Sequence, residues 1–196
     1  MGVLLAVLTP LRLMNEGALA VGRAIGIVAV ALMVVAILIQ VFYRYALNNA
    51  LPWPDEAARF CMLWMTGLMA PTAFRRGGFV AIDTLVVLLP RALAGALSLF
   101  LLFLSLGVLL VAVQIGWSEV TGFAGRFATA SLYLPTDLSF ENWFRIPRSW
   151  MMASLLIGVI LLISVNVELI LRAIVKLLGA ADRLPPISLE EKVGAE

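Results

Sequence analysis

The side chains able to do chemistry are concentrated between residues 51 and 78. Asp55 and Glu56 are adjacent carboxylates and could in principle form a general acid–base pair. However, adjacent residues of a helix point about 100° apart and do not converge on one substrate atom. Pro54 suits a first helical position, and carboxylates in a first turn are stabilised by the helix dipole. We therefore interpret the acidic pair as an anchor for the start of a helix.

The basic residues near this stretch have two candidate roles each. Arg59 lies four residues after Asp55, so the two can pair on one helical face; the alternative is an ion pair from Arg59 to a partner subunit. Arg75 and Arg76 close the apolar run, where they determine topology and can bind anionic lipid head groups. Asp83 then follows, and we expect it to cap a short surface segment at 84–89.

Composition places this chemistry in a membrane. Hydrophobic residues make up 63% of the chain and charged residues 13%, about half the share of a soluble domain. The apolar surplus requires lipid as its solvent. The net charge of +2 is small and its residues flank hydrophobic runs, which argues against nucleic-acid binding. Without His, and with Cys61 as the single cysteine, bis-histidine haem, zinc sites and disulfides within the chain are excluded, and no cofactor is expected.

Hydropathy predicts an all-α integral membrane protein with four spans, in one domain at 1–180 followed by a tail at 181–196. The predicted spans are residues 24–43, 57–74, 92–117 and 150–171. Residues 1–13 are too short to span before Pro10 and are expected to be interfacial, with Arg12, Asn15 and Glu16 facing water. Trp53 is of the type that settles at the membrane–water boundary.

The distribution of basic residues predicts orientation. The N-terminal segment, the connection at 75–91 and the tail carry nine Lys and Arg residues, against five on the opposite side. This asymmetry predicts that both termini are cytoplasmic. The Trp53 corner and the loop at 118–147 then face outward.

The ordered set of motifs resembles the DctQ family, the small membrane subunits of TRAP (tripartite ATP-independent periplasmic) transporters. The resemblance covers about residues 21–178. It rests on these residues: Arg44, Tyr45, Asn48, Trp53, Asp55, Glu56, Ala58, Arg59, Trp64, the run 73–78, Val80, Ile82, Asp83, Ile146, Pro147 and Trp150.

The resemblance implies two partners: a large membrane subunit that carries sodium and substrate, and a periplasmic protein that captures the substrate, usually an organic acid. It implies a bacterial inner-membrane location. We expect Trp53, Asp55, Glu56, Arg59 and Trp64 to anchor the interface or contact a subunit. The outward loop offers contacts for the binding protein at Arg126, Asp137, Glu141 and Arg145.

The membrane spans themselves offer little to bind a cargo. Gln40, Gln114 and Glu168 are the candidates for a translocation path, but all three are expected near span ends, close to water. Glu168 and Arg172 are spaced to pair on one face. Small residues allow helices to approach closely, either within the chain or against a second protein; they are Gly95, Gly107, Gly116, Ser154 and Gly158.

We therefore expect a non-catalytic scaffold subunit of a sodium-coupled symporter, which contacts membrane lipids and no nucleic acid. One alternative is a small integral membrane enzyme acting on lipids, which would need converging carboxylates, a His or a metal site. The other is a stand-alone four-helix channel or exporter, which would need polar groups at mid-membrane depth.

Overall fold

The computed structural model describes residues 2–77, 90–135 and 143–179. These residues form long helices joined by short connections, with one small sheet. The elements in chain order are α1 (Gly2–Ala46), α2 (Trp53–Arg75), α4 (Arg91–Thr121), the 3-10 turn η1 (Ala124–Arg126), β1 (Ala128–Pro135), β2 (Trp143–Pro147) and α5 (Ser149–Leu177). Asp83, the segment 84–89, Asp137, Glu141 and the tail 181–196 lie outside the described residues.

Each predicted span lies inside one of these helices. Among the described residues, three helical stretches are long and apolar enough to cross a membrane: Val7–Ala46, Leu93–Thr121 and Ser149–Leu177. The 23-residue α2 is also long enough at about 1.5 Å of rise per residue, but it carries more polar residues. The structure is therefore that of a helical membrane protein, with α2 as the least apolar of its long helices.

The expectation of a separate interfacial segment at residues 1–13 is wrong. α1 is one helix of 45 residues and passes through Pro10 without ending. Proline removes one backbone donor and disfavours a helix interior. Packing keeps the helix intact because Leu8 is buried and Asn15 is bonded to α5. Asn15 is accordingly buried rather than facing water, and Arg12 and Glu16 are half-buried.

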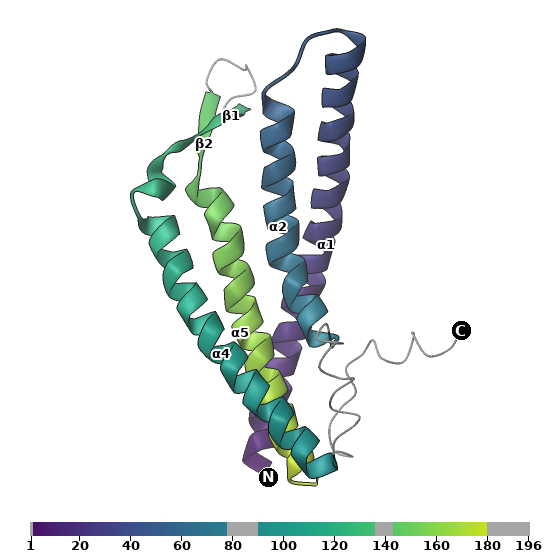
Figure 1. Cartoon of the computed structure of the whole chain (residues 1–196), viewed down its shortest axis with the longest axis vertical. Coiled ribbons are helices and arrows are strands. Elements are labelled where there is room, and N and C mark those ends of the chain that lie inside the picture. The colour runs from purple at the N-terminus through teal and green to yellow at the C-terminus, as the bar shows by residue number, and fades with distance from the viewer. Residues whose placement is uncertain (1, 78–89, 136–142, 180–196) are drawn as a thin grey trace, which may run out of the picture.

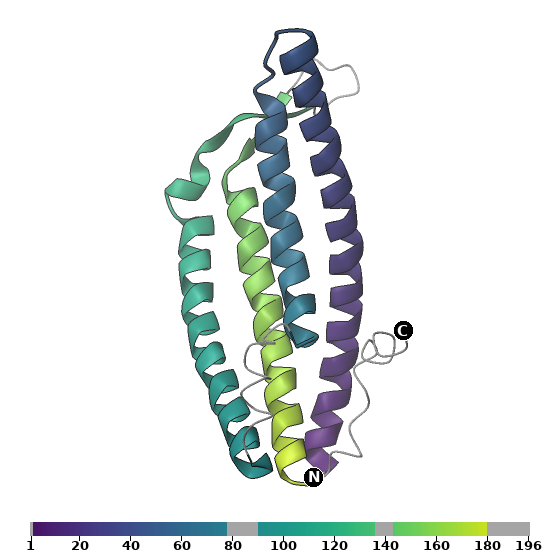
Figure 2. The same ribbon diagram turned by 45° about the vertical axis from the view of Figure 1, so that its right-hand side comes forward.

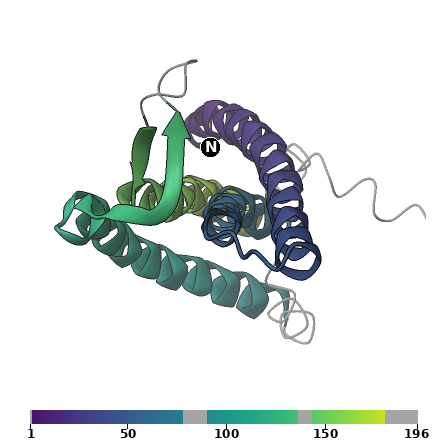
Figure 3. The same cartoon turned by 90° about the horizontal axis from the view of Figure 1, so that it is seen from above.

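α2 and α5 lie in the middle of the molecule, with α1 on one side and α4 on the other (Figures 1 and 3). α1 runs the full length of the bundle, whereas α2 stops short of the lower ends of the other helices (Figure 2). The buried core in the lower half joins three helices through Leu19, Phe74 and Val165. Leu102 of α4 packs against the same core. One face of every outer helix is left for lipid.

The expectation of an all-α fold is wrong at the loop between α4 and α5. β1 and β2 pair there as an antiparallel hairpin, with Tyr133 opposite Arg145 and Ala128 opposite Pro147. Thr129 is buried, and its hydroxyl donates to the Ile146 carbonyl at 2.8 Å. β-Branched and aromatic residues favour such pairing. The hairpin lies beside the upper turns of α2 (Figure 1).

α2 and α5 approach each other at backbone distance. A Cβ added at Gly158 would lie 2.4 Å from the Gly67 carbonyl oxygen, so neither position has room for a side chain toward the other helix. Pro71 lies four residues after Gly67 and lacks the N–H that would bond this carbonyl within the helix. Four of the five small residues predicted to allow close approach are used within the chain: Ser154 and Gly158 between α2 and α5, and Gly95 and Gly116 between α4 and α5.

Candidate functional site

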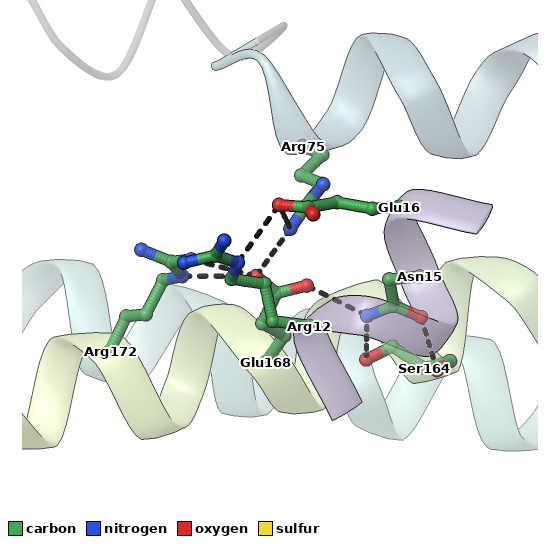
Figure 4. Close-up of polar contacts among 7 residues, drawn as sticks. All are labelled: Arg12, Asn15, Glu16, Arg75, Ser164, Glu168 and Arg172. Carbon is green, nitrogen blue, oxygen red and sulfur yellow. Dashed lines mark hydrogen bonds and ion pairs between the residues drawn. The ribbon is translucent and has the colours of Figure 1, made fainter. Parts of the chain in front are cut away.

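Glu168 of α5 is the centre of a buried ionic cluster (Figure 4). Its side chain is 0% exposed, and its Oε1 accepts from the Arg75 guanidinium of α2 at 2.7 Å. Arg172, one turn further along α5, donates to the same oxygen at 3.0 Å. The predicted Glu168–Arg172 pair is confirmed. α1 and α2 cover the Glu168 side chain, and its location near the end of a membrane span stays a prediction.

Asn15 of α1 is the third hydrogen-bond donor to Glu168. Its Nδ2 donates to Glu168 Oε2 at 2.7 Å, and its Oδ1 accepts from the Ser164 hydroxyl at 2.7 Å. Figure 4 shows the amide between these two side chains of α5. Both ends of the Asn15 side chain are therefore bonded to one helix. This fixes the rotation of α1 against α5.

The edge of the ionic cluster is more open. Arg12 Nε lies 2.9 Å from Glu16 Oε1 one turn along α1, and both side chains are 26% exposed. The same Glu16 oxygen lies 3.6 Å from the Arg75 guanidinium. The cluster thus links two carboxylates to three guanidinium groups across α1, α2 and α5.

This arrangement can hold helices together but offers no reactive group. A buried charge is tolerated only when it is paired and hydrogen-bonded, and Glu168 receives donors on both oxygens. Removal of one partner would leave a buried charge without its counter-charge. Among the described residues, no three acidic or cysteine side chains gather as a metal site would require. The cluster is a three-helix joint.

A second carboxylate joins α2 to the hairpin at the opposite end of the bundle. Glu56 accepts from the backbone amides of Ala130 and Ser131 and from the Ser131 hydroxyl, the last at 2.6 Å. The Ser131 hydroxyl oxygen also lies 3.0 Å from the Pro52 carbonyl oxygen. Glu56 therefore anchors β1 in addition to standing in the first turn of its own helix. We call these contacts the Glu56 latch.

Electrostatics favour the ionised form of Glu56. Partial burial by itself raises the pKa of this carboxyl. The hydrogen bonds from Ser131 and Ala130, with the nearby positive charge of Arg145, outweigh burial and lower the pKa below its ordinary value. The latch is consequently closed by a carboxylate at neutral pH.

The other residues predicted around the start of α2 do not join this latch. Asp55 and Arg59 are both exposed, and in the described part of the chain they form no ion pair with each other. Trp53 is 40% exposed at the first position of the helix. Trp64 is half-buried on the following turns. Their roles as an interfacial anchor or subunit contact stay predictions.

The paired arginines at the end of α2 have different environments. Arg75 is 7% exposed and is occupied by Glu168 and Glu16, whereas Arg76 is exposed. Only Arg76 presents its side chain for a lipid head group. Just before the hairpin, Arg126 is exposed on η1. Arg145 donates to the Thr129 and Ala130 carbonyls and lies 5.5 Å from the Tyr133 ring centroid, so it serves the hairpin itself.

Sequence reasoning missed Asn15 and Arg75 as partners of Glu168. The available signal was Glu168 itself, since a carboxylate within an apolar helix requires a partner. Its i+4 neighbour Arg172 supplied one pairing, but the other two partners come from residues 93 and 153 positions away. Only the packing of α1 and α2 on α5 brings them together.

Long apolar helices around a buried three-helix joint define an integral membrane helical bundle without a reactive centre in its described residues. The family model for the tripartite ATP-independent periplasmic transporters, DctQ component, matches residues 33–176. The chain belongs to this family and is thus a membrane component of a TRAP transporter. A comparison with curated proteins gave no match.

Proposed function

We propose that this chain is the non-catalytic scaffold subunit of its TRAP transporter. In this role it supports the large membrane subunit, which carries the substrate through the membrane. The family assignment supports a place in the complex. The joint at Glu168 supports a static role, because it ties three helices to one another.

The observation that carries the proposal is the full engagement of Glu168. A cargo site for a cation requires an oxygen ligand that is free to exchange its partner. Both Glu168 oxygens already accept short hydrogen bonds from α1 and α2, at 2.7 Å each. A sodium ion could enter only by displacing buried guanidinium or amide donors. The carboxylate therefore acts as a brace between helices.

The membrane arrangement that we propose is the one predicted from the sequence. α2 crosses the bilayer in addition to the three more apolar helices, which gives four spans. From the Trp53 corner to the joint, α2 is about 34 Å long at 1.5 Å of rise per residue. Both termini lie in the cytoplasm of a bacterial cell, and the protein is in the inner membrane. The excess of Lys and Arg beside the joint and the tail supports this orientation.

The transport reaction belongs to the assembled complex. By resemblance to its family, it imports an organic acid by symport with sodium. The periplasmic binding protein docks at the outward end of the assembled complex. Specificity for the substrate resides in the partner polypeptides, since the fully buried carboxylate among the described residues, Glu168, is bonded on both oxygens.

Copurification tests the scaffold role. The tagged chain is expressed together with the large membrane protein encoded beside it and is purified in mild detergent. The two chains are expected to elute as one complex in equal amounts. A chain that elutes alone, while the large protein is present in the same membranes, would contradict the proposal.

Arg59 provides a sharper version of this experiment. It is exposed on α2 and forms no ion pair with Asp55, so it is available to a partner subunit. Arg59→Glu is expected to reduce the amount of large subunit retained. Arg126→Glu makes the same charge change on η1 and is the matched control, expected to retain it fully. Equal retention in both variants would remove Arg59 from the interface.

A further inference from the structure

Exposed aromatic side chains surround the hairpin at the end of the bundle. Phe123 is 78% exposed and Trp143 is 54% exposed. Some of these rings contact one another: Phe123 and Phe127 stack edge to face with centroids 5.1 Å apart, and Phe144 lies 6.3 Å from Trp150. We call this group the aromatic rim; its members are Phe123, Phe127, Tyr133, Trp143, Phe144 and Trp150.

The aromatic rim lies at the end of the bundle where α2 and α5 begin and α4 ends. The Glu56 latch holds Ala130 and Ser131 of β1 against the first turn of α2. Glu56 lies three residues after Trp53 in that turn. Phe144 contacts Trp150 at the start of α5, whose apolar span begins there. Figure 1 shows β2 rising from the start of α5, and β1 lies beside the upper turns of α2. The hairpin is thus folded against the helix ends.

The exposed rings disfavour water around the aromatic rim, and the backbone of the hairpin disfavours hydrocarbon. Six exposed aromatic rings are poorly suited to water, and together they continue the apolar surface of α4 and α5. Glu56 binds two backbone amides of β1, but among the described residues no third strand lies beside β2 in the two-stranded sheet, and the backbone groups at such an edge need water that hydrocarbon cannot supply. The headgroup boundary satisfies both, because aromatic rings and hydrated backbone are each stable there.

We propose that the aromatic rim inserts into the headgroup boundary of the outer leaflet and makes the hairpin an interfacial anchor. The occupant of this surface is lipid. The exposed guanidinium groups of Arg126 and Arg148 lie among the rings in sequence and meet the lipid phosphates. The Glu56 latch and the aromatic rim together hold the outward ends of α2, α4 and α5 at one depth in the membrane.

Depth-dependent fluorescence quenching tests the proposal. The chain has five tryptophans, and a variant that keeps Trp143 alone, with the other four changed to Phe, is placed in lipid vesicles. A nitroxide near the lipid headgroup is expected to quench Trp143 roughly twofold more than one near the chain end, and aqueous iodide is expected to quench it weakly. The matched variant keeps Trp64 alone, on α2, and should show the reverse order of the two nitroxides.

Strong quenching of Trp143 by iodide, with no effect of either lipid probe, would overturn the proposal and favour a surface for a soluble partner. A second measurement uses the unchanged chain, so that no substitution can disturb the hairpin. A lipid with a photoreactive headgroup should label peptides containing residues 123–127 and 143–150. Labelling confined to other segments would also overturn the proposal.

Discussion

At the scale of single residues, two carboxylates define the molecule. Glu168 is the more costly of the two because it is fully buried, and its charge is balanced by Arg75 and Arg172. A buried ion pair contributes little net stability over an apolar pair, but breaking it leaves an uncompensated charge. Glu168 therefore specifies how α1, α2 and α5 meet more than it adds to the free energy of folding.

Substitution Glu168→Gln should destabilise the bundle strongly. The change leaves two buried guanidinium groups without their carboxylate, and the expected loss of unfolding free energy is about 3 kcal/mol. Unfolding by heat or denaturing detergent measures it. Glu16→Gln is the control, since its pair is 26% exposed and should cost less than about 1 kcal/mol. Equal effects of the two substitutions would contradict a buried joint.

The Glu56 latch should depend on pH. Its pKa is lowered in the folded state from an ordinary value of 4.5, so its contribution is fully present above that value. The contribution is lost as the pH falls through the lowered folded pKa. Hydrogen exchange of the Ala130 and Ser131 amides should be slower in the unchanged chain than in Glu56→Gln at neutral pH, and the difference should vanish in acid.

Asp55→Asn is the matched control for this prediction, since Asp55 is the exposed neighbour of Glu56. It should leave the exchange of both hairpin amides unchanged. If it accelerates exchange as much as Glu56→Gln does, the effect belongs to the start of α2 in general and not to the latch.

The sequence identifies part of this residue chemistry. It places Glu56 at a helix start and pairs Glu168 with Arg172, because both inferences depend on local spacing. It cannot provide Asn15, Arg75 or Ser131, which come from other elements. Arg75 shows the limit clearly: a basic residue after an apolar run is typical of a topology determinant, yet packing buries this one.

At the scale of elements, hydropathy is sufficient to find the helices but not their ends. An apolar run specifies where the chain must avoid water, and the backbone continues the helix beyond it wherever packing or capping allows. α1 extends through Pro10 for this reason, as Leu8 and Asn15 are both buried. The hairpin escaped prediction because β2 has only five residues and the pairing is irregular between residues 128 and 133.

The contact between α2 and α5 yields a prediction about glycine. Gly158→Ala places a methyl group 2.4 Å from the Gly67 carbonyl, so the helices must separate, and we expect a loss of about 1–3 kcal/mol in unfolding free energy. Gly107→Ala on α4 is the control, with no atom within 4 Å of the added Cβ. Alanine there should be neutral or slightly stabilising. Similar losses at both positions would contradict the close approach.

At the scale of the whole molecule, composition and motif order predicted the class correctly. The excess of apolar residues indicates a membrane protein, and the ordered motifs indicate the DctQ family, which the match over residues 33–176 confirms. The interior of the bundle was not predictable in the same way, because it depends on which helix faces meet. The resulting picture is a bundle braced by the ionic cluster at one end and by the Glu56 latch at the other.

The scaffold role predicts which combinations of membrane subunits take up substrate. Vesicles containing this chain alone, vesicles containing the large membrane subunit alone and vesicles containing both are compared for sodium-driven uptake, each with the periplasmic binding protein added outside. The proposal predicts no uptake by this chain alone and full uptake only when both membrane subunits are present. Sodium-driven uptake by vesicles that contain this chain as their only membrane protein would contradict it.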